Sequence, residues 1–181
     1  MMKLYGIKDP EVENEKTIVK KALKYDLDTS NIVTVCSEEF PYVLSGQSIP
    51  DGSIYDRNGK YIEYRLTDTS CNAGLFDFIP SLNLNVKYHQ PDTTDLNAEL
   101  KKFRDLRGNI LKQPELADFY LLIYWTVWTG KLNRDHVSIW EQLAMENKNC
   151  KIKVIKVNLD IQDYWDEGER KKIIEAMSKK K

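Results

Sequence analysis

The chain has 181 residues, enough to bury the full hydrophobic core of one domain. Its 27 basic and 28 acidic side chains leave a formal net charge of −1, which argues against a nucleic-acid partner and against an anionic membrane surface. Hydrophobic residues make up 41% and charged residues 30%, as in a soluble globular protein. No apolar run approaches the roughly 20 residues of a membrane span.

The first 16 residues, MMKLYGIKDPEVENEK, lack the apolar core of a signal peptide. The sequence as it stands therefore predicts a cytoplasmic protein. If a leader was removed in front of the doubled methionine, we would expect a periplasmic or membrane-tethered protein instead. Nothing in the sequence indicates the oligomeric state.

The three cysteines, Cys36, Cys71 and Cys150, are widely spaced and form no CxxC pair. They therefore indicate neither a redox motif nor a zinc site, and we expect them to be small buried or half-buried residues. The two histidines, His89 and His136, have no metal-ligand spacing to a cysteine or carboxylate cluster. We predict no metal and no other cofactor.

The first expected element is a helix over residues 12–25, with Asp9 as its cap and Pro10 as its first helical residue. The β-branched run NIVTVC over residues 31–36 predicts a short strand. Residues 38–46 include Pro41 and are ambiguous between a further short strand and a loop.

A hairpin follows. Two alternating runs, over residues 53–55 and 60–66, flank the sequence DRNG, in which Asn58 and Gly59 tolerate positive φ. Apolar residues at helical spacing then predict a helix over residues 71–82, with Pro80 disturbing its last turn.

Two more helices are expected later in the chain. After a connection over residues 84–94, a helix over residues 95–107 has Thr94 or Asp95 as its cap and Gly108 as its stop. A final amphipathic helix covers residues 166–177, with Ile173, Ile174 and Met177 facing inward.

Residues 117–160 form the central unit of the chain. An apolar run from Phe119 to Trp128 is followed by Thr129 and Gly130, a helical pattern, and a second strand over residues 152–158. This pattern predicts two parallel strands joined by a helix, with the first strand covered on both faces. Asn133 is a good N-cap for that helix, and free backbone amides there would favour an anion.

The segment YWTVWTGKL, residues 124–132, resembles the FWATWCGPC segment of membrane-associated and secreted thioredoxin-like proteins. Trp125 and Trp128 occupy the two tryptophan positions, and Gly130 the position of the first glycine. Thr129 and Leu132 stand where that motif has its two cysteines. Disulfide exchange needs a thiolate, so the resemblance implies a site that is redox-inactive at these positions.

The resemblance implies a thioredoxin-like α/β/α sandwich of three layers with a mixed sheet, formed as a single domain by residues 1–181. Residues 1–94 would supply a helix, a strand, the hairpin and a helix, and residues 95–181 a helix followed by the β-α-β-α half. In that fold a cis-proline precedes the hairpin, and Pro50 is the candidate. The family places its β-α-β unit before the hairpin, whereas this chain has the reverse order. Either the fold is circularly permuted, which we favour, or a differently ordered sheet imitates the motif locally.

By this resemblance we expect a groove that holds an extended polypeptide. Its residues would be Trp125, Trp128, Thr129, Gly130, Lys131 and Pro50. The chain would then be a binding or accessory protein for a peptide or protein partner. The alternatives are a thiol-dependent oxidoreductase that uses Cys71 or Cys36, and a purely structural domain of a larger assembly.

Overall fold

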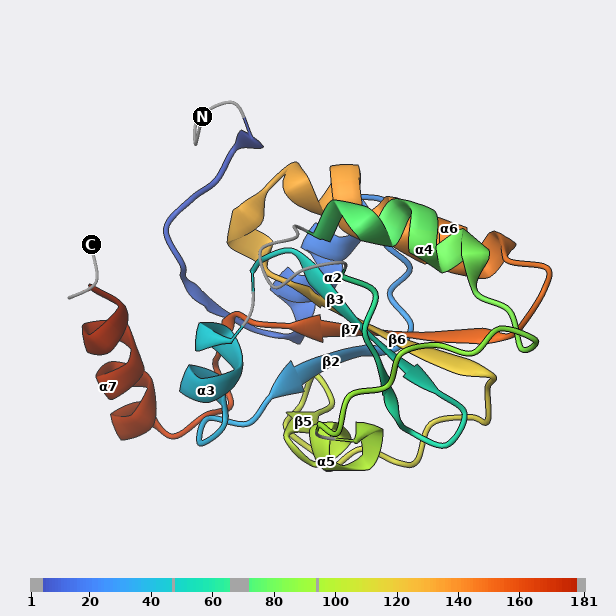
Figure 1. The fold of residues 1–181 in the computed structure, drawn as a ribbon. Coiled ribbons are helices and arrows are strands. Elements are labelled where there is room, and N and C mark those ends of the chain that lie inside the picture. The colour runs from blue at the N-terminus through green and yellow to red at the C-terminus, as the bar shows by residue number, and fades with distance from the viewer. Residues whose placement is uncertain (1–4, 47, 66–71, 94, 179–181) are drawn as a thin grey trace.

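The computed structural model describes residues 5–46, 48–65, 72–93 and 95–178 (Figure 1). Its centre is a six-stranded mixed sheet with the strand order β4-β3-β6-β7-β2-β5. In chain order these strands are β2 (Ile32–Val35), β3 (Asp51–Asp56), β4 (Tyr61–Ile62), β5 (Phe103–Arg104), β6 (Phe119–Trp125) and β7 (Ile152–Asn158). Two further short strands, β1 (Val12–Glu13) and β8 (Ile161–Gln162), pair with each other in parallel.

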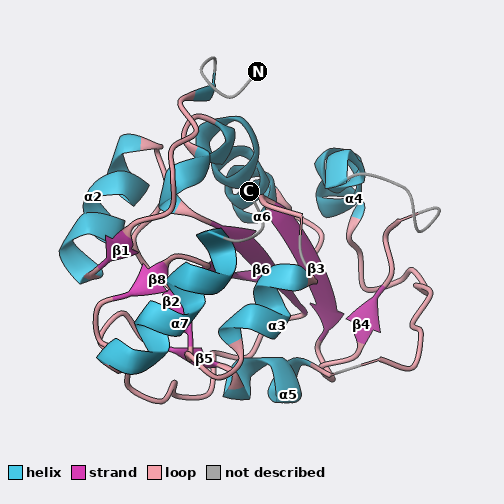
Figure 2. Cartoon of the chain, turned by 90° about the vertical axis from the view of Figure 1, so that its left-hand side faces the viewer, coloured by secondary structure: helices cyan, strands magenta, loops and turns pink. Residues whose placement is uncertain are grey.

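Helices cover both faces of the sheet (Figures 1 and 2). The helices are α2 (Glu15–Lys24), α3 (Phe40–Ser45), α4 (Leu75–Ser81), α5 (Leu96–Lys101), α6 (Ile139–Glu146) and α7 (Glu167–Ser178). Short 3₁₀ turns span Asn72–Gly74 and Val127–Thr129, and a π-helical segment, Asn133–Ser138, leads into α6.

Two apolar cores define the layers. Helices α2, α4 and α6 contribute Ile18, Leu75 and Trp140 to the core on one face. On the other face α3 and α5 contribute Phe40 and Leu96, and α7 packs against the same core. The expected α/β class, with a mixed sheet between helices, is therefore confirmed.

The central strand β6 is buried along all seven residues. Side chains alternate across a strand, so Leu121 and Ile123 enter one core, whereas Tyr120 and Leu122 enter the other. This double burial explains why its sequence is apolar without alternation.

Three strands meet at one end of the sheet. Strand β7 runs parallel to β6, with Asn158 opposite Trp125, which confirms the predicted β-α-β unit. Strand β3 runs antiparallel to β6, and Asp51 lies opposite Tyr124. The Ile49–Pro50 peptide bond is cis, as expected, and the register places Pro50 beside the carboxyl end of β6.

The predicted hairpin is also present, because β3 and β4 pair in antiparallel fashion, but β3 is longer than the predicted run over residues 53–55, and β4 is much shorter than the run over residues 60–66. The carboxylate of Asp56 accepts hydrogen bonds from the backbone N–H groups of Asn58 and Lys60, both at 2.9 Å. Gly59 has φ +81°, the left-handed conformation that this turn requires.

Some predicted boundaries are wrong. The first helix begins at Glu15 rather than at residue 12, because Asn14 and Thr17 form a capping box. Residues 38–46 were ambiguous between a short strand and a loop, but they contain the helix α3. Pro41 lies in the first turn of this helix, where its missing N–H has no cost.

The helix predicted over residues 95–107 ends at Lys101, and Phe103–Arg104 continues as a strand antiparallel to β2. Ile174 is 40% exposed and does not face inward as predicted. The predicted helix over residues 71–82 is found over residues 72–81, and Cys71 lies outside the described residues. Within the described ranges, no helix is long and apolar enough to cross a membrane.

Candidate functional site

The candidate site lies at the carboxyl ends of β6 and β7, where open α/β sheets commonly bind ligands. The chain leaves β6 after Trp125 and turns through Val127–Thr129 to Gly130, which has φ +63°. Lys131 follows with an exposed side chain. We call residues Trp128–Lys131 the motif turn.

Thr129, at the first cysteine position of the resembled motif, is turned into the protein and is only 2% exposed. Its hydroxyl oxygen lies 2.8 Å from the carbonyl oxygen of Thr126 and 3.0 Å from Oδ1 of Asn133. Asn133 in turn donates from Nδ2 to the carbonyl oxygen of Thr126 at 2.8 Å. The three polar groups therefore satisfy one another and fix the shape of the turn.

The predicted anion site at the start of the helix is not formed. Asn133 is not an exposed N-cap, because it is buried, and its backbone N–H donates to the carbonyl of Gly130 at 3.2 Å. The N–H of Asp135 donates to the carbonyl of Lys131 at 3.1 Å. These amides already have acceptors in the turn itself, so they do not favour an anion.

Part of the chain that lies far away in sequence crosses the motif turn, with Gly6 in a turn at φ +68°. We call residues 5–11 the N-terminal segment. The backbone N–H of Lys8 donates to the carbonyl of Trp128 at 3.0 Å, and the N–H of Lys131 donates to the carbonyl of Tyr5 at 2.8 Å. A Cβ atom on Gly130 would collide with the carbonyl oxygens of Tyr5 and Gly6. Glycine at position 130 therefore allows this close approach as well as the positive φ.

A pocket of about 260 Å³ lies between the N-terminal segment, α2 and the motif turn. Among the six predicted groove residues, Trp128, Gly130 and Lys131 line this pocket. The other three, Trp125, Thr129 and Pro50, are buried and do not line it. The indole N–H of Trp128 has no acceptor among the described residues.

Beneath the turn, Asp160 is 1% exposed at the end of β7. Its Oδ2 accepts from the backbone N–H of Val127 at 2.7 Å and from Nδ2 of Asn158 at 2.6 Å, whereas Oδ1 has no partner. Burial raises the pKa of Asp160 to about 7, against the smaller opposing effect of the two hydrogen bonds. The charge of Glu13 raises that pKa further.

Sequence reasoning assigned no role to this carboxylate, and in the N-terminal segment it predicted only that Asp9 and Pro10 begin a helix. The sequence does carry a signal for the carboxylate of Asp160. At the end of β7 the polar residues Asn158, Asp160 and Gln162 alternate with apolar residues. Their side chains form one hydrogen-bonded group, in which Nε2 of Gln162 donates to Oδ1 of Asn158 at 3.1 Å. No comparable pattern marks the N-terminal segment.

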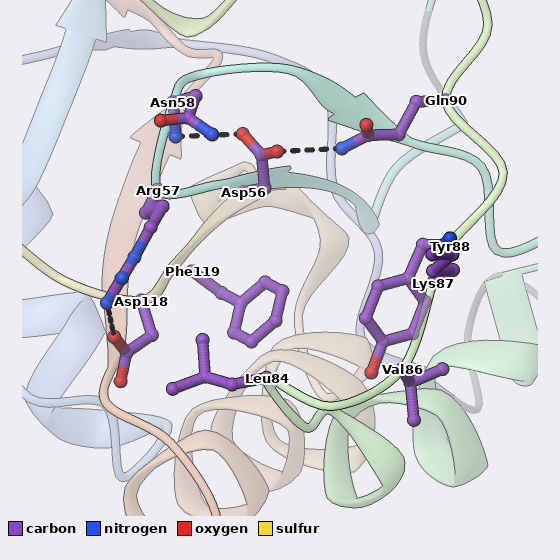
Figure 3. A pocket seen from close by; sticks show the side chains of 10 residues that line it. All are labelled: Asp56, Arg57, Asn58, Leu84, Val86, Lys87, Tyr88, Gln90, Asp118 and Phe119. Atoms are coloured by element: carbon purple, nitrogen blue, oxygen red, sulfur yellow. Dashed lines mark hydrogen bonds and ion pairs between the residues drawn. The ribbon is translucent and has the colours of Figure 1, made fainter.

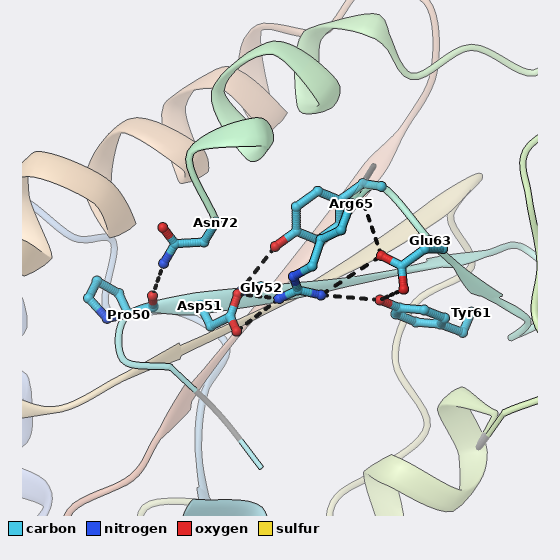
Figure 4. Close-up of polar contacts among 8 residues, drawn as sticks. Pro50, Asp51, Gly52, Tyr61, Glu63, Arg65 and Asn72 are labelled. Atoms are coloured by element: carbon cyan, nitrogen blue, oxygen red, sulfur yellow. Dashed lines mark hydrogen bonds and ion pairs between the residues drawn. The ribbon is translucent and has the colours of Figure 1, made fainter. Parts of the chain in front are cut away.

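A second polar cluster surrounds the start of β3 (Figure 4). Asp51 is 4% exposed and accepts from Nη2 of Arg65 at 2.8 and 2.9 Å and from the hydroxyl of Tyr64 at 3.2 Å. Nδ2 of Asn72 donates to the carbonyl of Pro50. Burial raises the pKa of the Asp51 carboxyl, although the guanidinium of Arg65 opposes this. Both carboxylate oxygens of Asp51 are paired, so the cluster holds the start of β3 in contact with the chain that follows β4.

Neither described cysteine has the environment of an activated thiol. Cys36 is buried and Cys150 is half-buried, and burial raises the pKa of both thiols. A reactive cysteine needs the opposite shift, toward the thiolate. Cys71, the other thiol considered from the sequence, lies outside the described residues.

A larger pocket, of about 370 Å³, lies at the opposite end of β6 (Figure 3). Its floor is apolar, with Phe119 beside Leu84 and Val86. Most of its charged groups are already paired, since Arg57 contacts Asp118 at 2.5 Å and Gln90 donates to Asp56 at 2.8 Å. No backbone group of the motif turn reaches this pocket.

The described residues contain no group of three or more His, Cys, Asp or Glu side chains that could hold a metal ion. No protein-family model, no curated protein and no solved structure matches the chain. The function is therefore argued from the geometry of the site.

Proposed function

We propose that the chain is a thioredoxin-like binding or accessory protein, with its elements in circularly permuted order, that binds an extended segment of a peptide or protein partner at the motif turn. In this proposal the turn keeps a peptide-binding role without disulfide chemistry. The observation that carries it is the main-chain pairing of the motif turn with the N-terminal segment of the chain itself.

The sheet supports the permuted order. The hairpin β3-β4 comes before β6 in the chain, yet β3 lies directly beside β6 in the sheet, with β7 on the other side of β6. The pairing β4-β3-β6-β7 therefore joins the hairpin to the β-α-β unit within one sheet, as permutation of a thioredoxin-like chain requires. Pro50 lies at the same end of the sheet as the motif turn.

The motif turn offers the two backbone groups that an extended peptide needs. The carbonyl of Trp128 accepts and the N–H of Lys131 donates, and Gly130 between them leaves room for a second backbone. Main-chain hydrogen bonds of this kind give affinity with little dependence on sequence, as in strand addition to a sheet edge. Side chains around the pocket then supply specificity.

The residues at the two cysteine positions support a role without redox chemistry. The hydroxyl of Thr129 is buried and bonded within the turn, and Leu132 has no group that could resolve a disulfide. Burial also raises the pKa of Cys36, which does not favour the thiol-dependent alternative.

An array of ten-residue peptides of varied sequence, probed with the full chain, tests the proposal. We expect a set of peptides to bind. We expect Trp128→Ala to lower their affinity about tenfold, because it removes an aromatic side chain from the wall of the pocket. The triple variant Cys36→Ser, Cys71→Ser, Cys150→Ser should bind the same peptides with unchanged affinity.

The matched control is Leu84→Ala, which changes an exposed apolar residue of the pocket at the other end of β6. If Leu84→Ala weakens binding and Trp128→Ala does not, the peptide site lies at that other pocket. Binding that disappears in the cysteine-free variant would favour the thiol-dependent alternative.

A further inference from the structure

We infer that the N-terminal segment is an internal occupant of the peptide site and that the partner is an extended acidic peptide, which displaces this segment. The inference rests on the proposed function and adds to it both the partner's chemistry and a competition for the site. Three features of the described residues carry it: the hydrogen bonds of the segment, its exposure, and the charges that surround it.

The segment binds as a peptide ligand would. The carbonyl of Tyr5 and the N–H of Lys8 form hydrogen bonds with the motif turn. The carbonyl oxygens of Tyr5 and Gly6 pass directly over Gly130. These bonded groups belong to the backbone, and Gly6 between them has φ +68°, a conformation that favours glycine. Another backbone can therefore replace the segment if it makes the same turn at the position of Gly6.

The segment is also held weakly. Gly6, Lys8, Asp9 and Glu11 are exposed, and no residue of the segment belongs to either apolar core of the described chain. An exposed backbone hydrogen bond contributes little net free energy, because water competes for its donor and acceptor. Local opening of the segment therefore costs much less than unfolding of the domain.

The charges around the pocket indicate what replaces the segment. The segment itself supplies two acidic side chains, Asp9 and Glu11, and one basic side chain, Lys8, to the pocket lining. The remaining wall carries four cationic side chains, which are Lys21, Lys24, Lys131 and Arg134. Arg134 also pairs with Asp26 at 2.8 Å.

Once the segment leaves, Glu13, which is 7% exposed, supplies the only carboxylate among the described residues of the remaining lining. A wall with four cations and one buried acid attracts an acidic peptide and disfavours a basic one. The partner therefore combines an extended backbone with acidic side chains.

The test compares the wild-type full chain with Lys8→Pro and Lys8→Ala. Proline removes the N–H that pairs with the carbonyl of Trp128, whereas alanine removes the same charge and keeps that N–H. The probe is a synthetic peptide with the sequence of residues 3–11 in which the lysine at the position of Lys8 is replaced by glutamate. Binding is followed through the backbone amide signal of Lys131 in NMR spectra.

We expect the probe to bind Lys8→Pro about tenfold or more tightly than it binds the wild type or Lys8→Ala, and to shift the Lys131 signal. Without probe, the Lys131 amide should exchange with solvent faster in Lys8→Pro than in Lys8→Ala. Equal affinity of the probe for all three proteins would overturn the inference. The inference would also be overturned if the probe bound none of the three.

The charge of the partner is tested with a second pair of variants. In the Lys8→Pro background, Lys131→Glu should lower the affinity for the acidic probe severalfold. Lys148→Glu makes the same charge change at an exposed position outside the pocket and should leave binding unchanged. A probe whose acidic residues are changed to lysine should bind more weakly than the acidic probe; the opposite order would overturn the acidic assignment.

The inference and the proposed function fail in different ways. If array peptides bind the wild type and Lys8→Pro equally, at the motif turn, the proposed function stands and the competition does not exist. If only the probe derived from the segment binds, and no array peptide does, the internal contact is real but the turn does not serve a partner.

Discussion

Lys156→Met is expected to lower the free energy of unfolding by about 3–5 kcal/mol. Lys156 is 1% exposed in the middle of β7, and its Nζ pairs with Oε1 of Glu141 on α6, which is itself buried. Removal of the lysine leaves a buried carboxylate without its counter-charge, whereas the other oxygen of Glu141 still accepts from the backbone N–H of Asp28 at 3.0 Å. Urea unfolding measures the loss.

The double variant Lys156→Met, Glu141→Gln should recover most of this loss, because glutamine is neutral and keeps an acceptor for the N–H of Asp28. The matched exposed pair is Lys171 with Glu167, at 2.7 Å and about 70% exposed on both sides. Lys171→Met should change the free energy of unfolding by less than about 0.5 kcal/mol. Equal losses at positions 156 and 171 would contradict the assignment of a buried ion pair.

Asp160→Asn is expected to stabilise the protein above neutral pH. Burial raises the pKa of Asp160 to about 7 in the folded state, from an ordinary 3.8. The folded state therefore holds this proton more tightly than the unfolded state does. The resulting stabilisation is fully present below about pH 4 and is lost as the pH rises through 7.

Asparagine reproduces the protonated carboxyl, because its oxygen accepts from the N–H of Val127 and its NH₂ group takes the place of the unpartnered Oδ1. The unfolding free energies of variant and wild type should be similar near pH 4, and the variant should be more stable by on the order of 3 kcal/mol at pH 9. Asp163→Asn, which removes a carboxylate at an exposed position in the same connection, is the matched control. A constant difference between Asp160→Asn and wild type from pH 4 to 9 would contradict the buried, protonated carboxyl.

The central elements could be predicted because their sequence signals are local and strong. Strand β7 matches its predicted residues 152–158, and β6 begins at the predicted Phe119. Because β6 is buried on both faces, its residues are apolar without alternation, and this pattern predicts a central strand. The hairpin was equally clear, since the sequence of its turn suits positive φ at Gly59.

Other boundaries depended on contacts that are distant in sequence. The helical spacing of apolar residues continues past Lys101, but Phe103 is completely buried as an edge strand beside β2. Tertiary pairing overrode the helical pattern there. The start of α2 was missed for a local reason, because the capping box of Asn14 and Thr17 competes with Asp9 and Pro10 as a start signal.

Three of the six residues that the resemblance placed in a groove, Trp128, Gly130 and Lys131, line the pocket, and peptide binding there stays a prediction. Thr129 is turned away from the pocket because its hydroxyl bonds inside the turn. The backbone N–H of Lys131 already has an acceptor, the carbonyl of Tyr5, which lies far away in sequence. Spacing alone cannot reveal such a contact.

The most direct measurement for the central claim is a crystal structure of the full chain bound to a peptide selected from the array. The account predicts that the peptide backbone accepts a hydrogen bond from the N–H of Lys131 and donates one to the carbonyl of Trp128, with the N-terminal segment displaced. A peptide bound at the pocket beside Phe119, with the segment still lying over Gly130, would contradict it.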